Sequence, residues 1–120
     1  MRQISNPDFW KMLDKLVVEN KIVIDRPKHS RHPCFPEIIY PLDYGYLEGT
    51  SSMDGEGIDL WLGSLPERTL RAVFITIDPE KKDSEIKLMI GCTDAEIAAV
   101  DHFFNDYPSM KALLIYREED

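Results

Sequence analysis

The fold of this chain is indicated most directly by two neighbouring stretches, Tyr40-Pro41-Leu42-Asp43-Tyr44-Gly45-Tyr46 and Asp54-Gly55-Glu56-Gly57-Ile58-Asp59-Leu60-Trp61-Leu62. In the first stretch, the tyrosines and Gly45 predict extended segments that meet at a turn. In the second, a polar loop leads into a strand whose alternation places Asp59 and Trp61 on the face opposite the aliphatic residues. An unpaired carboxylate is unfavourable within an apolar strand, so Asp59 is expected to have a chemical role.

The flanking elements are predicted from periodicity and capping residues. Asn6 and Pro7 open an amphipathic helix that is expected to run to about Glu19. A capping box that starts at Thr93 opens a second helix, which is expected to reach about Tyr107. Strands are predicted at residues 22–25, 38–41, 44–49, 58–62, 70–77, 85–90 and 111–116. One α+β domain spanning residues 1–120 follows from this pattern.

Composition excludes several classes of protein. Of the 120 residues, 43% are hydrophobic, which is enough for one core, and the longest apolar runs are far below the roughly 20 residues of a membrane helix. A net charge of -8 disfavours nucleic acid and anionic membranes as partners. The start of the chain lacks an apolar signal region, which predicts a cytoplasmic protein. Cys34 and Cys92 lack metal-binding spacing and are expected to be free thiols.

The carboxylates of Asp54, Glu56 and Asp59 predict a site for a hard cation. They lie close together on a loop that contains two glycines, and Mg²⁺ prefers oxygen ligands of this kind. The alternative is a solvated acidic turn ahead of a strand. A second acidic group flanks Lys87 and consists of Asp78, Glu80, Asp83 and Glu85.

Positive charge is concentrated between residues 26 and 32 of this acidic chain. Arg26, Lys28 and Arg31 stand there together with His29 and His32, which predicts an anion site or, alternatively, a solvated basic loop. A carboxylate cage, a cationic loop and the tyrosine hydroxyls together suit a phosphate-rich anion that binds with a divalent metal.

Residues 40–46, followed eight residues later by residues 54–60, resemble the soluble inorganic pyrophosphatase family, whose pattern is YPxNYGY leading into DGDPxDxxV. Residues 102–107 resemble the late HFFxxY of that family, and residues 22–27 resemble its early strand. The resemblance implies an α+β fold with a small OB-like β-barrel and helices packed outside it. It also implies Mg²⁺-dependent hydrolysis of pyrophosphate to phosphate by a metal-activated water, and a homo-oligomer.

The same resemblance implies roles for individual residues. Glu56 takes the place of the general base, and Asp54 and Asp59 flank it in the catalytic centre. The implied metal ligands are Asp25, Asp54, Asp59, Asp83 and Glu85. The implied substrate-binding residues are Lys28, Arg31, Tyr44, Lys87 and Tyr107. His32 is an alternative to Arg31, and Asp78 and Asp83 fit the acidic cluster only after a gap.

The chain also departs from the family pattern. Glu56 replaces an aspartate, Gly57 a proline and Pro108 a lysine, and the stretch between Asp25 and Tyr40 is short. Lys28 is a candidate replacement for a lysine of the missing hairpin. These departures leave two alternatives open: a non-catalytic member that binds a phosphorylated ligand or a protein partner, and a hydrolase of another phosphoanhydride.

Overall fold

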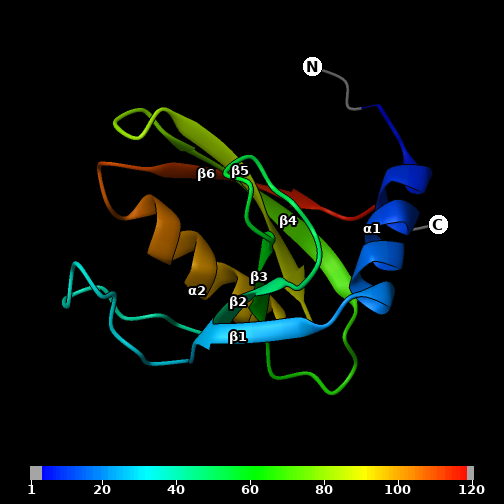
Figure 1. The fold of residues 1–120 in the computed structure, drawn as a ribbon, viewed down its shortest axis with the longest axis horizontal. Helices are drawn as coiled ribbons and strands as arrows, with labels where there is room; N and C mark the ends of the chain where they lie inside the picture. Colours follow the sequence, from blue (N-terminus) through cyan, green and yellow to red (C-terminus); the bar gives the residue numbers. More distant parts are fainter. Residues whose placement is uncertain (1–3, 119–120) are drawn as a thin grey trace.

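The protein is built around one mixed six-stranded sheet with a helix packed on each face (Figure 1). The computed structural model describes residues 4–118. The elements in chain order are α1 (Pro7–Glu19), β1 (Ile22–Arg26), β2 (Asp43–Leu47), β3 (Ile58–Leu62), β4 (Leu70–Asp78), β5 (Asp83–Ile90), α2 (Asp94–Asn105) and β6 (Lys111–Tyr116). The α+β class expected from the sequence is therefore confirmed. Neither helix is long and apolar enough to cross a membrane.

The strands lie in the order β1-β2-β3-β5-β4-β6. Only β3 and β5 pair in parallel, and every other neighbouring pair is antiparallel. A barrel needs its two edge strands to pair with each other. Within residues 4–118, β1 and β6 stay at opposite edges of an open sheet, so the expected OB-like barrel is not confirmed.

Strand alternation divides the core into two layers. On one face Trp61, Phe74 and Met89 pack against α2 through side chains such as Val100 and Phe104. On the other face the aliphatic residues of β3, β4 and β5 pack against Trp10 and Leu13 of α1. The predicted separation of Trp61 from the aliphatic residues of β3 is confirmed, and Asp59 lies on the α2 face with Trp61.

The helices begin where their capping residues predict. The side chain of Asn6 accepts from the Phe9 backbone N–H, and Thr93 forms a complete capping box with Glu96. The second helix ends at Asn105, two residues before the predicted end. The Asn105 amide bonds both backbone groups of Ala112, which ties the helix terminus to β6.

The segment of residues 27–42 differs from the prediction. Residues 38–41 do not form a strand, and the segment contains only an isolated bridge between Arg31 and Ile39. Prolines at positions 36 and 41 remove backbone donors that a strand would need. The segment instead leaves the sheet as a loop and returns to it, burying Tyr40 in the layer beneath α2.

Candidate active site

A cavity of about 440 Å³ opens on the α2 face of the sheet. Its walls come from the loop of residues 27–42, the turn between β4 and β5, and the residues that follow α2, which gather at one end of the molecule (Figure 1). Its charged and imidazole side chains are Arg26, His32, Glu37, Asp78, Glu80, Lys81, Asp83, Glu85 and Lys87. Its aromatic side chains are Phe35, Tyr40, Tyr44, Trp61, Phe103, Phe104 and Tyr107.

Lys87 is the centre of a buried polar network on the cavity floor. Its ammonium lies 2.6 Å from Asp59 Oδ2 and 2.7 Å from Glu85 Oε1, and it donates to the Tyr44 hydroxyl at 2.9 Å. The Tyr44 hydroxyl donates in turn to Asp59 Oδ2 at 2.7 Å. Asp59 and Lys87 meet because they are direct partners across the parallel β3–β5 pair. All three ammonium hydrogens are engaged, so Lys87 has none left for a ligand in this arrangement.

Burial and charge fix the protonation states of this network. Burial alone would lower the pKa of Lys87, but Tyr44, Asp59 and Glu85 outweigh it and raise that pKa. For the Tyr44 hydroxyl, burial acts in the opposite direction and raises the pKa, and the nearby ammonium of Lys87 only partly opposes this rise. At neutral pH, Lys87 is therefore a cation and Tyr44 a neutral donor.

A β-bulge brings Arg26 into the cavity. The register passes from Ile24 opposite Gly45 directly to Arg26 opposite Tyr44, which leaves Asp25 without a partner. Asp25 is exposed and is not among the lining residues, whereas Arg26 lines the cavity beside Tyr44. The guanidinium of Arg26 donates to the Tyr40 hydroxyl and lies 5.4 Å from the centre of that ring.

His32 presents a neutral imidazole at neutral pH. Its Nδ1 accepts from the backbone N–H groups of Cys34 at 3.0 Å and Phe35 at 3.2 Å, so the proton of the neutral ring is assigned to Nε2. Burial, followed by the charges of Arg26 and Lys81, lowers the pKa of His32. Arg26, His32 and Lys81 all line the cavity, where each can donate a hydrogen bond to a phosphate oxygen. Within residues 4–118, the Lys81 ammonium has no carboxylate within ion-pair distance.

Two aspartates are opposite each other in the register where β4 meets β5. Asp78 and Asp83 are direct partners across the antiparallel pair, and both line the cavity. Asp78 is only 6% exposed, and its Oδ1 accepts from the backbone N–H groups of Glu80 and Lys81. Like charges directly opposite each other destabilise a sheet, so this position favours a cation between the two groups.

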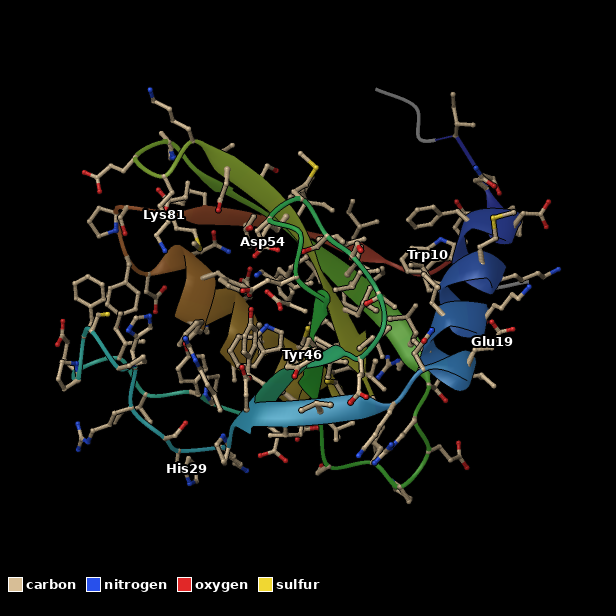
Figure 2. The ribbon with its side chains drawn as sticks, in the orientation of Figure 1. Trp10, Glu19, His29, Tyr46, Asp54 and Lys81 are labelled. Carbon is tan, nitrogen blue, oxygen red and sulfur yellow. The ribbon has the colours of Figure 1, made fainter. Side chains whose placement is uncertain are left out.

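The predicted carboxylate cage is not assembled in this conformation. Asp54 lies in the exposed loop between β2 and β3 (Figure 2), where its Oδ1 accepts from the Ser52 hydroxyl and from the Glu56 backbone N–H. These hydrogen bonds lower the pKa of Asp54. Glu56 is exposed on the same loop, and neither residue lines the cavity. Over residues 4–118, no group of three or more His, Cys, Asp or Glu side chains has the geometry to hold a metal ion.

The predicted substrate-binding residues fall into two sets. Tyr44, Lys87 and Tyr107 line the cavity, whereas Lys28 and Arg31 are exposed on the loop outside it. The Arg31 guanidinium donates to the backbone carbonyl of Pro36.

Arg26 belongs to the predicted basic loop, but the substrate-binding residues that the family resemblance implies include neither Arg26 nor Lys81. A bulge leaves no recognisable signal in a single sequence, so the position of Arg26 in the cavity was not predictable. Lys81 had a weak signal, because it follows Asp78 in the charged turn that leads to Lys87.

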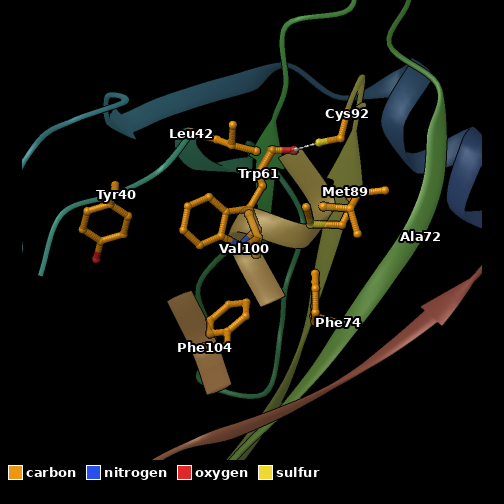
Figure 3. Close-up of a cluster of buried hydrophobic side chains, with 10 residues drawn as sticks. Tyr40, Leu42, Trp61, Ala72, Phe74, Met89, Cys92, Val100 and Phe104 are labelled. Carbon is orange, nitrogen blue, oxygen red and sulfur yellow. Dashed lines mark hydrogen bonds between the residues drawn. The ribbon is translucent and has the colours of Figure 1, made fainter. Parts of the chain in front are cut away.

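Trp61 belongs to the buried hydrophobic cluster that Figure 3 shows, and it is also among the residues that line the cavity. Its ring contacts Tyr44 at a centroid distance of 4.7 Å and Phe103 at 5.1 Å. Although Trp61 is fully buried, its indole N–H has no acceptor among the residues that the structure describes. Leaving such a buried donor unpaired costs about 1–3 kcal/mol.

Cys92 lies in the buried layer that Figure 3 shows, where burial raises the pKa of its thiol to about 12. Cys34 is exposed, and both cysteines are free, as expected.

Comparison with known proteins relates the chain to others through its structure. No protein-family model matches it, and no curated protein does. An inorganic pyrophosphatase from Neisseria gonorrhoeae aligns with a TM-score of 0.60 at 17% identity, over 75% of this chain and 77% of that one. The inorganic pyrophosphatase from Helicobacter pylori gives a TM-score of 0.55 at 17% identity, over 79% and 81% of the two chains. That from Coxiella burnetii gives 0.55 at 16% identity, over 82% and 84%.

The similarity covers most of each chain, and at this identity it establishes architecture. The resemblance carried by residues 40–46 and 54–60 is thereby confirmed at the level of the fold. The chain has a divergent inorganic pyrophosphatase-like fold.

Proposed function

We propose that the protein hydrolyses a phosphoanhydride, with inorganic pyrophosphate converted to phosphate as the reaction and Mg²⁺ as the cofactor. The pyrophosphatase-like fold supports the proposal. The observation that carries it is the cavity itself, which joins the carboxylates of Asp78 and Asp83 to the donors Arg26, His32 and Lys81. A phosphate–metal complex needs this combination of anionic and cationic side chains.

The charge of the cavity supports dependence on a divalent cation. Five carboxylates and three permanently charged bases line it, so with neutral His32 the lining carries a net negative charge. A free polyphosphate anion is repelled by such a lining. Mg²⁺ that enters with the anion lowers this repulsion, because the metal offsets part of the negative charge.

The residues present fit Mg²⁺ that enters with its substrate. Mg²⁺ in phosphate sites is held by one or two carboxylates together with waters and substrate oxygens, without a complete protein cage. Asp78 and Asp83 are the residues that would hold it. When bound, Mg²⁺ would supply electrostatic stabilisation of the phosphoryl oxygens and a more acidic water.

The protein groups then have separate roles. Arg26, His32 and Lys81 bind phosphoryl oxygens and offset the charge that develops on them. Lys87 positions Asp59 and Glu85, and it is free to turn toward the substrate only if it gives up one of its present partners. Glu56 stays the proposed general base and requires the loop of residues 51–57 to approach the cavity.

The Lys87 network favours a second candidate function, a non-catalytic module that binds a phosphorylated ligand. An ammonium already lies between Asp59 and Glu85, where the family resemblance implies metal ligands. In this alternative the cavity binds the anion but does not cleave it.

Phosphate release separates the two candidates. We expect purified protein to release phosphate from pyrophosphate with Mg²⁺ and not with EDTA, and we expect Asp78→Asn to lower the rate on the order of a hundredfold. Asp8→Asn is the matched control, because Asp8 is exposed on α1 and far from the cavity lining. Saturable pyrophosphate binding without phosphate release would establish the binding module instead.

A further inference from the structure

The cavity has an aromatic side that inorganic pyrophosphate does not need. Seven of its 21 lining residues are Phe, Tyr or Trp, and they come from β2, β3, the 27–42 loop and the end of α2. Pyrophosphate presents only oxygens and negative charge to its surroundings. An aromatic wall of this extent gives such an anion neither hydrogen bonds nor charge compensation beyond those of the tyrosine hydroxyls.

Two of the aromatic side chains are accessible to a ligand. Phe35 is 54% exposed and Tyr107 is 39% exposed, and both line the cavity. They belong to segments that are distant in the sequence, on the 27–42 loop and directly after α2. Large exposed aromatic residues that share one cavity are typical of a binding surface for a flat apolar group.

His32 connects the aromatic side of the cavity to its cationic side. Its ring lies 5.3 Å from Phe35 and stacks on Tyr40, with an interplanar angle of 9° and a centroid distance of 6.3 Å. It also lies within the electrostatic influence of Arg26 and Lys81. A ligand that spans the cationic and aromatic sides of the cavity would therefore place an anionic end beside Arg26 and Lys81 and a ring toward Phe35.

We propose that the site takes a phosphoanhydride that carries an aromatic base, of the chemical class of the nucleoside diphosphates. The diphosphate lies against Arg26, His32 and Lys81, and the base packs on the aromatic wall that includes Phe35. A cavity of about 440 Å³ is within the range of about 300–1,000 Å³ that is usual for ligands of this size. The proposal rests on the proposed function, since it names the substrate class of the same site.

Three non-hydrolysable probes test this proposal by calorimetric titration with Mg²⁺. The first is the α,β-methylene analogue of ADP. The second is the same analogue of ribose 5-diphosphate, which keeps the sugar and both phosphorus groups but lacks the base. The third is methylenediphosphonate, which represents pyrophosphate alone.

We expect the ADP analogue to bind on the order of tenfold more tightly than the analogue without a base, as stacking of one base on aromatic side chains allows. Phe35→Ala should remove this difference, and it should lower the affinity for methylenediphosphonate much less than the affinity for the ADP analogue. Phe9→Ala is the matched control, because Phe9 is 43% exposed on α1 and does not line the cavity.

The outcomes separate this inference from the proposed function. If the ADP analogue and the analogue without a base bind equally well, the site does not select nucleotides and this inference is overturned. If methylenediphosphonate also binds in that case, the proposed phosphoanhydride site is still supported. A base preference that Phe35→Ala does not change overturns the proposed location of the base. Absence of binding by all three probes overturns both proposals.

Discussion

The ammonium of Lys87 is nearly buried between Asp59 and Glu85, and its side chain is only 9% exposed. Removal of one partner from a buried ion pair costs about 3–5 kcal/mol, because it leaves charge uncompensated. We expect Lys87→Met to lower the free energy of unfolding in urea by roughly 3 kcal/mol at pH 7, since Asp59 remains partly accessible to water.

The sign of the pH dependence provides a control for Lys87→Met. The loss of unfolding free energy caused by Lys87→Met should become smaller toward pH 4, because carboxyl groups begin to bind protons there and their mutual repulsion falls. Adding Glu85→Gln to Lys87→Met should also restore part of the stability at pH 7. A deficit that is independent of pH and of Glu85 would mean that Lys87 contributes packing and not charge.

His32 predicts how anion binding responds to pH. Its pKa lies below the ordinary histidine value in the free protein, and a bound anion favours the imidazolium and raises that pKa. Affinity for methylenediphosphonate should therefore rise as pH falls below about 6.5. His32→Gln should flatten this part of the profile in calorimetric titrations, so that only the titration of the ligand itself remains. Identical profiles for the two proteins would exclude His32 from the anion site.

Glu56 tests the role that the family resemblance implies. If the loop of residues 51–57 approaches the cavity during turnover, Glu56→Gln should lower the steady-state rate on pyrophosphate by at least about a hundredfold, as loss of a general base requires. Glu48→Gln provides a control, because Glu48 is exposed just before the same loop. Undiminished turnover of Glu56→Gln would show that another group activates the water.

Because of the bulge in β1, Arg26 rather than Arg31 is expected to contribute to pyrophosphate binding. Arg26 faces Tyr44 and lines the cavity, whereas Arg31 is exposed and donates to a backbone carbonyl. We expect Arg26→Gln to weaken pyrophosphate binding about tenfold or more, because a charge-assisted hydrogen bond contributes roughly 1.5–3 kcal/mol. Arg31→Gln is the matched control and should change the affinity little. Equal losses in calorimetric titration would mean that the 27–42 loop folds over the ligand.

Regular elements were predictable because their signals are local. Strand β3 follows from simple alternation and α1 from Asn6 and Pro7, and both were placed within a residue of their observed bounds. The bulge at Asp25 was not predictable, because an extra residue in a strand changes its register without changing its composition. The 38–41 segment has β-branched residues, but its flanking prolines and the burial of Tyr40 determine its path.

The part of the candidate site that lies on strands was predictable from the sequence. Tyr44, Asp59 and Lys87 meet because β2, β3 and β5 are neighbours in the sheet. The family resemblance implied that these three residues belong to one site, but the order of the strands comes from the structure. The cavity also needs the end of α2, the 27–42 loop and the β4–β5 turn to converge. Convergence of segments that are far apart in the chain is a tertiary property, so the sequence held only a weak signal for Lys81 and none for the aromatic wall as a whole. The homo-oligomer stays a prediction, which light scattering would test.

Ligand binding should be visible in the stability of the complete chain. A ligand that binds only the folded state at about 100 times its dissociation constant adds roughly 2.7 kcal/mol to the free energy of unfolding. For a domain of this size that corresponds to a rise in melting temperature on the order of 10 °C. We expect this rise with Mg²⁺ and methylenediphosphonate together, and a much smaller one with either alone, because in the proposed function the anion enters the acidic cavity together with its cation. A full shift with methylenediphosphonate in EDTA would contradict the metal requirement, since Arg26, His32 and Lys81 would then bind the anion unaided.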